Sequence, residues 1–383
     1  MSKTDRQSEI CTPKSAYIHI PFCAHRCGYC NFTLIADRED LVEPFLQAVE
    51  LELTALEHPR GVDTLFFGGG TPSQLSEKQL QKLCELVLNW LPLADNGEFS
   101  VEVNPADFNR SKATVLSDYG ATRISLGAQS FDDHKLGILD RDHLSADILT
   151  AFDIARELAD QVSLDLIFGA PGETPDAWVN DLEAAVALQP DHLSTYGLTY
   201  ERGTSFWSRR SKGELTTVSE PDELTMYEEA IDLLSGTGFE HYEISNFAQP
   251  GRRCRHNEVY WKGGEYYAVG PGAARLVDGI RETNHRSTTT YIKRMLAGDS
   301  PVAERDVLSR EDIARERLVF GLRRLEGVDL ARLEQVSGCG IHELAGQSLD
   351  RHVETGLLEI SHGRLRLTRR GLLVSDSIWP DFM

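Results

Sequence analysis

Three thiols within a run of eight residues are the part of this chain best suited to chemistry. Cys23, Cys27 and Cys30 follow a short apolar run and share one predicted loop. A structural zinc site usually closes four ligands, whereas an iron–sulfur cubane held by three thiolates leaves one iron free for an outside ligand. The spacing therefore favours a [4Fe–4S] cluster, with a zinc site or a redox-active dithiol as the alternatives.

Polar side chains that suit a nucleotide-like ligand recur at the ends of later predicted strands. Glu102 can accept hydrogen bonds from ribose hydroxyls, as carboxylates do in nucleotide sites. Gln129 and Asp165 can orient polar groups, and Arg141 can pair with a carboxylate. Asp165 stands between two leucines, where a buried carboxylate needs a partner. For Arg141, which lies in a charged run, a solvated loop is the alternative.

A glycine run, GGGTP at residues 68–72, follows the second predicted strand. It lacks the Lys-Ser/Thr ending of a phosphate loop, and no helix begins directly at it. Glycines here would let the backbone approach a ligand closely, although a triple glycine is weak support for ligand contact by itself.

Aromatic residues gather far downstream, in the run RHNEVYW at residues 255–261. His256 can bind iron, while Tyr260 and Trp261 can stack on a flat aromatic ligand. Cys254 is a further soft ligand for iron. The alternative is a core histidine beside packed aromatics, which periodicity alone favours.

Six βα units must position these residues. Apolar periodicity predicts strands at 17–20, 63–67, 99–103, 121–126, 162–168 and 192–198, helices between them, and a last strand at 242–245. Repeated βα units make a parallel sheet, and this many in one direction predict an α/β fold with a partial (βα)6 TIM-like barrel. The candidate residues fall at the carboxyl ends of successive strands, where the active sites of such barrels assemble.

The chain divides into four predicted parts. They are a polar N-terminal tail at 1–15, the part-barrel at 16–247, a connecting aromatic and glycine-rich region at 248–308, and a mostly α module at 309–383. Within the connecting region, 252–261 and 266–272 are predicted to form loops. Three helices and an alternating segment that turns at His362-Gly363 make the last part resemble a winged helix. Such modules often bind DNA, but a packing or substrate-covering role is favoured here.

Composition narrows the function classes. The 39 Lys and Arg residues against 60 Asp and Glu residues give a net charge of −21, which argues against a broad nucleic-acid or anionic-lipid footprint. No apolar run is long enough to span a bilayer, and the first residues lack a signal core. Of the seven cysteines, three form one cluster and four are scattered, which is not the pattern of a disulfide framework. We expect a cytoplasmic protein.

Several motifs together resemble one known family. HIPFCAHRCGYCNF, GGGTP, VEVNP, RISLGAQSF and RHNEVYW are similar to the oxygen-independent coproporphyrinogen III oxidase-like family, of the radical S-adenosylmethionine (SAM) superfamily. True coproporphyrinogen dehydrogenases in this family carry a further cysteine two positions after the third ligand, where this chain has Phe32, and a longer N-terminal extension. Both departures, with the HNxxYW motif, favour the heme-chaperone branch. The family's frequent Gly-Ala-His is Gly-Ala-Ala here, ending at Ala274.

The resemblance implies a radical SAM part-barrel that binds a [4Fe–4S] cluster, SAM and heme. It assigns the cluster to Cys23, Cys27 and Cys30 and the heme-linked motif to His256, Tyr260 and Trp261. Tyr29 would pack on the adenine of SAM. The other implied SAM contacts are Tyr17, Gly69, Gly70, Thr71, Glu102, Gln129, Arg141 and Asp165.

Two functions follow from this resemblance. In the first, the protein binds heme and transfers it to client hemoproteins, touching the membrane from the cytoplasmic side during delivery. In the second, it is an enzyme that decarboxylates porphyrinogen propionates by radical chemistry. Phe32 favours the first. We expect no nucleic-acid partner and no integral membrane segment, while an electron donor for the cluster and a homodimer stay open.

Overall fold

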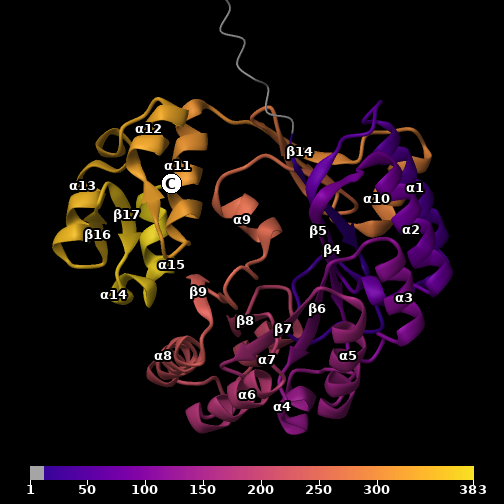
Figure 1. Cartoon of the computed structure of the whole chain (residues 1–383), viewed down its shortest axis with the longest axis horizontal. Coiled ribbons are helices and arrows are strands. Elements are labelled where there is room, and N and C mark those ends of the chain that lie inside the picture. The colour runs from indigo at the N-terminus through magenta and orange to yellow at the C-terminus, as the bar shows by residue number, and fades with distance from the viewer. Residues whose placement is uncertain (1–12) are drawn as a thin grey trace, which may run out of the picture.

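The computed structural model describes residues 13–383, and its centre is a nine-stranded sheet in the order β11-β1-β4-β5-β6-β7-β8-β10-β9 (Figure 1). Strands from β11 to β8 pair in parallel, whereas β10 is antiparallel to β8 and β9. The strands are β1 Ser15–Ile20, β4 Val62–Gly69, β5 Leu93–Val103, β6 Arg123–Gln129, β7 Gln161–Phe168, β8 His192–Gly197, β9 Glu240–Glu243, β10 Asn246–Ala248 and β11 Tyr267–Val269.

Helices cover the outer face of this sheet and leave its inner face to the site (Figure 1). Their buried faces form one continuous apolar core with the strands. None of the helices in residues 13–383 is both long and apolar enough to cross a membrane. The helices are η1 Glu39–Leu41, α1 Val42–Thr54, η2 Pro72–Gln74, α2 Glu77–Trp90, α3 Arg110–Asp118, α4 Asp133–Ile138, α5 Ser145–Leu158, α6 Pro175–Ala187, α7 Ser205–Ser211 and α8 Glu220–Gly236.

The helix starts follow local sequence signals. Ser76 and Gln79 form a capping box at α2, which satisfies backbone donors that the helix itself cannot pair. Thr174 accepts a hydrogen bond from the N–H of Ala177 at α6, where Pro175 occupies the first helical position. These signals lie where the periodicity predicted helices, and the six predicted βα units are all present.

Regular elements fill the connecting region at 248–308, so the prediction of loops at 252–261 and 266–272 was wrong. This stretch contains α9 Arg255–Trp261, strand β11 of the main sheet, a separate sheet of β12 Ala274–Val277, β13 Ile280–Asn284 and β14 Val302–Val307, and α10 Thr288–Leu296. Buried Glu52 of α1 holds it by accepting hydrogen bonds from Gly270 N at 3.0 Å, Asn284 Nδ2 at 2.7 Å and the Tyr291 hydroxyl at 2.7 Å. Strands this short carry too little alternation to be read from sequence.

Helix α9 lies between the sheet and the C-terminal module (Figure 1). It contacts β4, β5 and α11. Glu98 of β5 accepts hydrogen bonds from the N–H groups of Arg255 at 2.9 Å and His256 at 3.0 Å. A carboxylate at this end satisfies free backbone donors and opposes the helix dipole. Glu98 therefore fixes where α9 begins.

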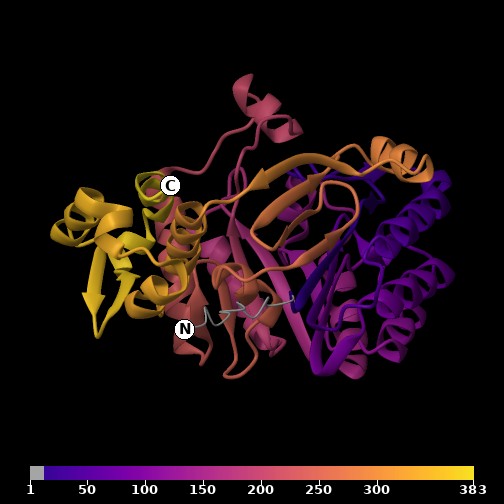
Figure 2. The ribbon, with the colours of Figure 1, turned by 90° about the horizontal axis from the view of Figure 1, so that it is seen from above.

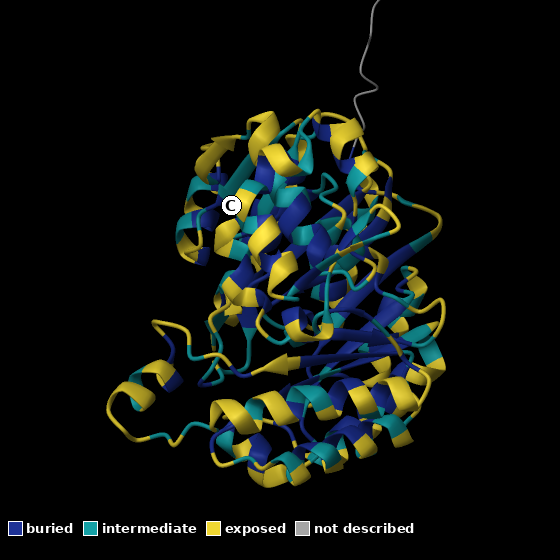
Figure 3. Ribbon diagram, turned by 90° about the vertical axis from the view of Figure 1, so that its left-hand side faces the viewer, coloured by how far each residue is buried: buried dark blue, intermediate teal, exposed yellow. Residues whose placement is uncertain are grey.

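The C-terminal module has its own apolar core. Figure 3 shows buried segments inside this module beneath an exposed outer surface. The predicted hairpin is confirmed: β16 and β17 pair across His362 and Gly363, both with positive φ. Its elements are α11 Arg310–Leu322, β15 Val328–Asp329, α12 Leu330–Ser337, α13 Ile341–Glu354, β16 Leu358–Ser361, β17 Arg364–Leu367, α14 Arg369–Leu372, α15 Ser375–Ile378 and η3 Trp379–Asp381.

Candidate functional site

The cysteine loop leaves the carboxyl end of β1 and is closed by two short strands, β2 Phe22–Cys23 and β3 Ile35–Ala36. Arg26 shapes the loop from within, because its guanidinium donates hydrogen bonds to the carbonyl oxygens of Cys30 at 3.2 Å, Phe32 at 3.2 Å and Leu34 at 2.6 Å. The N–H of Cys30 donates to the carbonyl oxygen of Cys27 at 3.1 Å. The loop is therefore ordered by its own residues.

All three thiols of the loop line one cavity of about 680 Å³ at the carboxyl ends of the strands. Cys23 Sγ lies 3.2 Å from the hydroxyl of Thr71, and Cys27 Sγ accepts a hydrogen bond from Arg141 Nη1 at 3.5 Å. Burial raises the pKa of Cys23 to about 12 and also raises that of Cys30. Metal binding would therefore displace protons from these thiols.

The glycine run lets the end of β4 pack against this loop. Gly69 has a φ of +106°, which suits glycine, and its N–H donates to Glu102 Oε2 at 3.1 Å. A Cβ on Gly70 would lie 2.7 Å from the carbonyl oxygen of Ile20 and 2.8 Å from that of Phe22. Both Gly69 and Gly70 therefore have a structural reason to be glycine, and both line the cavity.

Two carboxylates face the same cavity from neighbouring parts of the sheet. Burial and the nearby Asp165 raise the pKa of Glu102 to about 7. Burial also raises the pKa of Asp165, opposed by hydrogen bonds from Ser194 and from Ser125, whose hydroxyl lies 3.1 Å away. Two carboxylates in partial burial favour a cationic or hydrogen-bond-donating ligand between them.

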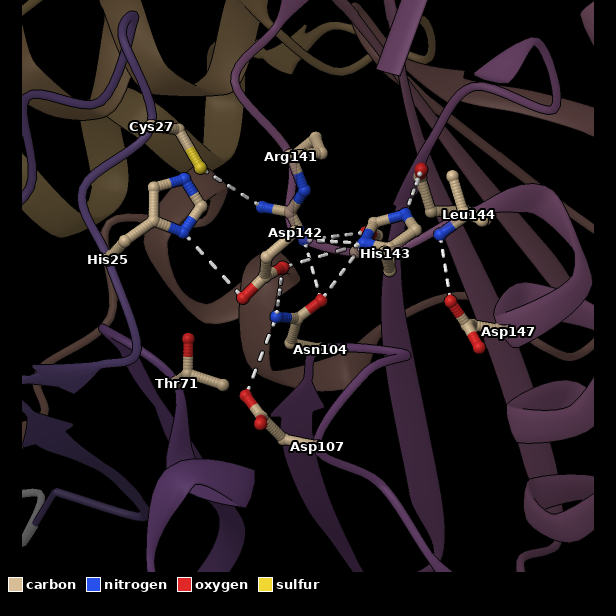
Figure 4. Close-up of polar contacts among 12 residues, drawn as sticks. His25, Cys27, Thr71, Asn104, Asp107, Arg141, Asp142, His143, Leu144 and Asp147 are labelled. Carbon is tan, nitrogen blue, oxygen red and sulfur yellow. Dashed lines mark hydrogen bonds and ion pairs between the residues drawn. The ribbon is translucent and has the colours of Figure 1, made fainter. Parts of the chain in front are cut away.

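Arg141 is held at the cavity wall by a network of polar contacts, shown in Figure 4. Its Nη2 donates to Asn104 Oδ1 at 2.9 Å and to the carbonyl oxygen of Gly127 at 3.1 Å. Asn104 also lies 3.1 Å from Nδ1 of buried His143 and donates through Nδ2 to Asp142 at 2.9 Å. Arg141 is thus an oriented part of the site and not a solvated loop residue.

Unpaired polar atoms in the wall suit a polar ligand. Gln129 Oε1 and Arg141 Nε are buried and have no hydrogen-bond partner among the described residues. Buried polar groups are normally paired, so an acceptor and a donor left free here fit the ammonium and carboxylate groups of SAM. Tyr29 also lines the cavity, with its ring packed edge-on against Phe206.

The thiol arrangement fits a cluster better than a single ion. Within residues 13–383 no group of three or more His, Cys, Asp or Glu side chains is arranged to hold one metal ion. In a cubane each thiolate binds a different iron, so the ligands stand further apart than those of a mononuclear zinc site. The three thiols line one cavity without forming such a single-ion group.

Comparison with known proteins identifies the family. The model described as "Radical SAM superfamily" matches residues 17–185, and "HemN C-terminal domain" matches residues 308–374. A Bacillus subtilis protein named "Heme chaperone HemW" is 35% identical, over 97% of this chain and 99% of its own. A Mycobacterium tuberculosis protein of that name is 37% identical, over 96% of this chain and 94% of its own. The chain belongs to the HemW family of the radical SAM superfamily.

Among solved structures, coproporphyrinogen III oxidase (HemN) from Escherichia coli has the same fold. Its TM-score is 0.85 at 23% sequence identity, and the match covers 97% of this chain and 90% of that one. This similarity confirms the predicted radical SAM fold with its C-terminal module. At this identity it concerns the fold alone.

The His, Tyr and Trp residues of the HNxxYW motif of this HemW-family chain lie on α9 and have three different environments. His256 is buried and both ring nitrogens are engaged: Nδ1 lies 3.0 Å from the hydroxyls of Ser15 and Thr64, and Nε2 lies 2.9 Å from that of Tyr260. Burial lowers the pKa of His256 to about 3, and its ring stacks on Phe66. His256 has the surroundings of the core histidine that the sequence offered as the alternative.

The other residues of the motif face outward from this core. Tyr260 lines a second recess of about 340 Å³, next to Tyr17 and Tyr266. Trp261 points to the C-terminal module, where its ring lies 4.5 Å from the guanidinium of Arg323 and packs on Phe320. The three motif residues therefore do not converge on one ligand position.

Nearly all predicted SAM contacts lie together in the main cavity. Gly69, Gly70, Thr71, Glu102, Gln129, Arg141, Asp165 and Tyr29 line it with the three cysteines. Tyr17 is the exception, because it lines the second recess and its hydroxyl lies 3.0 Å from Nδ1 of His19. Cys254 is buried beside Glu98 and lines neither cavity.

Sequence reasoning missed several residues that organise the site. His143 holds Arg141 together with Asn104, which the sequence places with Glu102 at the end of the third predicted strand; the signal available for His143 was its position beside Arg141. Glu98 and Glu102 are four residues apart in β5, and because side chains alternate along a strand, both carboxylates lie on the inner face of the sheet. Arg286 of the connecting region lines both cavities, and no motif pointed to it.

Proposed function

We propose that this chain binds heme and passes it to acceptor hemoproteins, with a [4Fe–4S] cluster on Cys23, Cys27 and Cys30 and SAM beside it. The observation that carries the proposal is Phe32, whose side chain is 66% exposed and lines both cavities. An exposed ring at an aromatic recess suits a planar tetrapyrrole. Phe32 also supplies no thiol where the coproporphyrinogen dehydrogenases carry a further cysteine.

The second recess is the proposed seat of the heme edge. Phe32 and Tyr260 offer ring faces, and Ala273 and Ala274 leave room where a larger side chain would intrude. Arg286 stands at the junction of both cavities, where its Nη2 donates to the carbonyl oxygen of Asn31 at 3.1 Å. A guanidinium there can pair with a heme propionate. His256 supports this wall by positioning Tyr260.

The main cavity is the proposed place of the cluster and SAM. In this proposal, Glu102 and Asp165 face the ribose and ammonium groups, and Arg141 and Gln129 orient the remaining polar groups of SAM. When bound, a cluster and SAM supply radical chemistry, and the protein contributes binding, orientation and exclusion of water. The predicted electron donor and the client hemoproteins are partners in the same proposal.

One reconstituted sample tests the proposal against the enzyme alternative. Under anaerobic, reducing conditions with SAM, the protein should take up heme stoichiometrically, measured by the heme absorbance change. Coproporphyrinogen III in a parallel reaction should stay unconverted, measured by fluorescence after oxidation of the products. Formation of protoporphyrinogen IX would overturn the proposal and assign the chain an oxidase activity.

A further inference from the structure

The segment around α7 projects from the rim of the main cavity. Figure 2 shows it as a rose-coloured loop and helix standing away from the body, and Figure 3 shows the same segment with mostly exposed residues. Leu198, Thr199 and Glu201 at its base line the cavity. The segment therefore begins at the site, and residues 202–213 extend beyond it.

Phe206 anchors this segment on the cysteine loop. Its side chain is fully buried, and its N–H donates to the carbonyl oxygen of Gly28 at 2.9 Å. A Cβ on Gly28 would lie 2.3 Å from the Phe206 ring, so the glycine makes this contact sterically allowed. Tyr29, between two of the cysteines, packs edge-on against the same ring. The segment and the cysteine loop thus form one packed unit.

The outer surface of this unit is cationic, and two of its guanidinium groups lie over aromatic rings, Arg209 5.5 Å from the centre of the Phe206 ring and Arg210 4.8 Å from that of Tyr200. It carries Arg202, Arg209, Arg210 and Lys212, and none of them takes part in an ion pair among the described residues. Trp207 beside them is 38% exposed. By contrast, Arg364, Arg366 and Arg369 of the C-terminal module pair with Asp329, Glu359 and Asp232. In a chain of net charge −21 such a surface stands out.

We propose that residues 202–212 form a docking surface for an acidic one-electron carrier protein. This inference rests on the proposed cluster. Small molecules bind in concave sites, whereas a projection with four cations outside any described ion pair and a half-exposed tryptophan suits the complementary face of a macromolecule. Contact through Phe206 and Gly28 places the bound carrier beside the cysteine loop. The carrier loses one electron to the cluster, and no bond forms or breaks.

A lipid surface is the competing occupant. An anionic membrane would attract the same cations through its lipid headgroups. Contact with a membrane does not require residues 202–212 to pack against the cysteine loop, whereas electron transfer to a cluster requires the carrier to bind close to that loop. The observations therefore favour a protein partner.

A charge-reversal pair at the two residues that flank α7, named the α7 pair, tests the surface. Arg202→Glu/Lys212→Glu changes two exposed cations for which no ion pair or side-chain hydrogen bond is seen in residues 13–383. Lys78→Glu/Lys293→Glu is the matched control, because these two cations are likewise exposed, and no ion pair or side-chain hydrogen bond is seen for them in residues 13–383. The probe is an oxidised, acidic plant-type ferredoxin, titrated onto the protein without a cluster at low and high salt.

We expect the α7 pair to weaken ferredoxin binding at least tenfold at low salt and to flatten its salt dependence, while the control keeps wild-type affinity. With the cluster reconstituted, reduction of the cluster by reduced ferredoxin should be slower in the α7 pair than in the wild type, by the same factor as the loss of binding. Reduction of the cluster by dithionite should be equally fast in both. A second variant, Arg209→Gln/Arg210→Gln, should show an intermediate loss.

Equal ferredoxin binding by wild type and the α7 pair overturns the proposal. A second contrary outcome is that the wild type binds phosphatidylserine vesicles but not ferredoxin, and that the α7 pair loses the vesicle binding. This outcome overturns the proposal in favour of a membrane. If no cluster forms, the proposed function fails, while ferredoxin binding to the protein without a cluster still decides the docking surface.

Discussion

Nε2 of His256 lies 2.9 Å from the hydroxyl of Tyr260, and this contact joins the buried start of α9 to the wall of the second recess. Nδ1 of the same ring lies 3.0 Å from the hydroxyls of Ser15 and Thr64. One imidazole thus ties α9 to both β1 and β4. The imidazole positions Tyr260, which can touch a ligand. Because both of its nitrogens are engaged, neither is free to bind iron.

His256→Ala should therefore act mainly on stability. Removing the ring leaves buried hydroxyls unpaired and a cavity beside Phe66, which should lower the free energy of unfolding by about 2–4 kcal/mol. Urea denaturation followed by circular dichroism measures this loss. The matched control is His342→Ala on the exposed side of α13, expected to change stability by less than about 0.5 kcal/mol. Unchanged stability with loss of heme uptake would instead make His256 a ligand.

The carboxyl of Glu102 should make SAM affinity depend on pH. Its pKa in the folded protein is about 7, above the usual 4.5, so it is largely protonated at pH 6 and ionised at pH 8. The ionised form attracts the cationic groups of SAM, so affinity should rise up to about tenfold over this range. Without ligand the folded state holds this proton more tightly than the unfolded state, so this stabilisation is complete below pH 4.5 and lost as the pH rises through 7.

Isothermal titration at pH 6 and pH 8 measures this pH dependence of SAM binding. Glu102→Gln should bind weakly and equally at both values. Glu183→Gln, on the exposed face of α6, is the control and should keep the wild-type difference. A wild-type affinity that falls between pH 6 and pH 8 would contradict the assigned role.

Gly70 should be indispensable for the shape of the cysteine loop. In Gly70→Ala the new methyl group would lie within 3 Å of backbone atoms of Ile20 and Phe22, which cannot move aside as a flexible side chain can. We expect a stability loss of about 1–3 kcal/mol and poor cluster reconstitution. Gly137→Ala on α4 meets open space and should reconstitute normally. Iron and sulfide analysis of both variants decides the outcome.

The sequence predicted the main fold because its elements are long and periodic. The six βα units carry clear apolar spacing, and residues at parallel strand ends necessarily meet at one edge, so Glu102, Gln129 and Asp165 come together as expected. The hairpin at His362 and Gly363 followed from alternation and turn chemistry. These features depend on local pattern and on the geometry of parallel sheets.

The stretch 248–308 could not be predicted in this way. Its strands have three to six residues, and their placement depends on Glu52, a buried carboxylate more than 200 residues earlier in the chain. The split of the HNxxYW motif likewise depends on tertiary contacts of α9 with Glu98 and Arg323. Such long-range pairings leave no trace in spacing, so sequence reasoning grouped His256 with Trp261.

Cys27→Ser should remove the cluster and separate it from heme binding. A serine hydroxyl replaces a thiolate that would hold one iron, so the visible absorbance of the reconstituted cluster should be lost. Heme uptake should persist, because the second recess contains none of the three cysteines. Cys339→Ser in the C-terminal module is the control and should keep both signals. Joint loss of cluster and heme in Cys27→Ser would show that the two sites depend on each other.

Phe32→Ser should weaken heme binding while leaving the cluster intact. The ring is 66% exposed in the free protein, so its removal should cost little stability, but covering it with heme would bury apolar area worth about 1.5 kcal/mol or more. We therefore expect about a tenfold or larger loss of heme affinity, measured by titration of the heme absorbance. Val307→Ser, at an apolar residue that is 69% exposed on β14, is the matched control and should bind heme as the wild type does. Equal heme affinity in Phe32→Ser and the wild type would place the heme elsewhere, and loss of the cluster would make Phe32 a structural part of the cysteine loop.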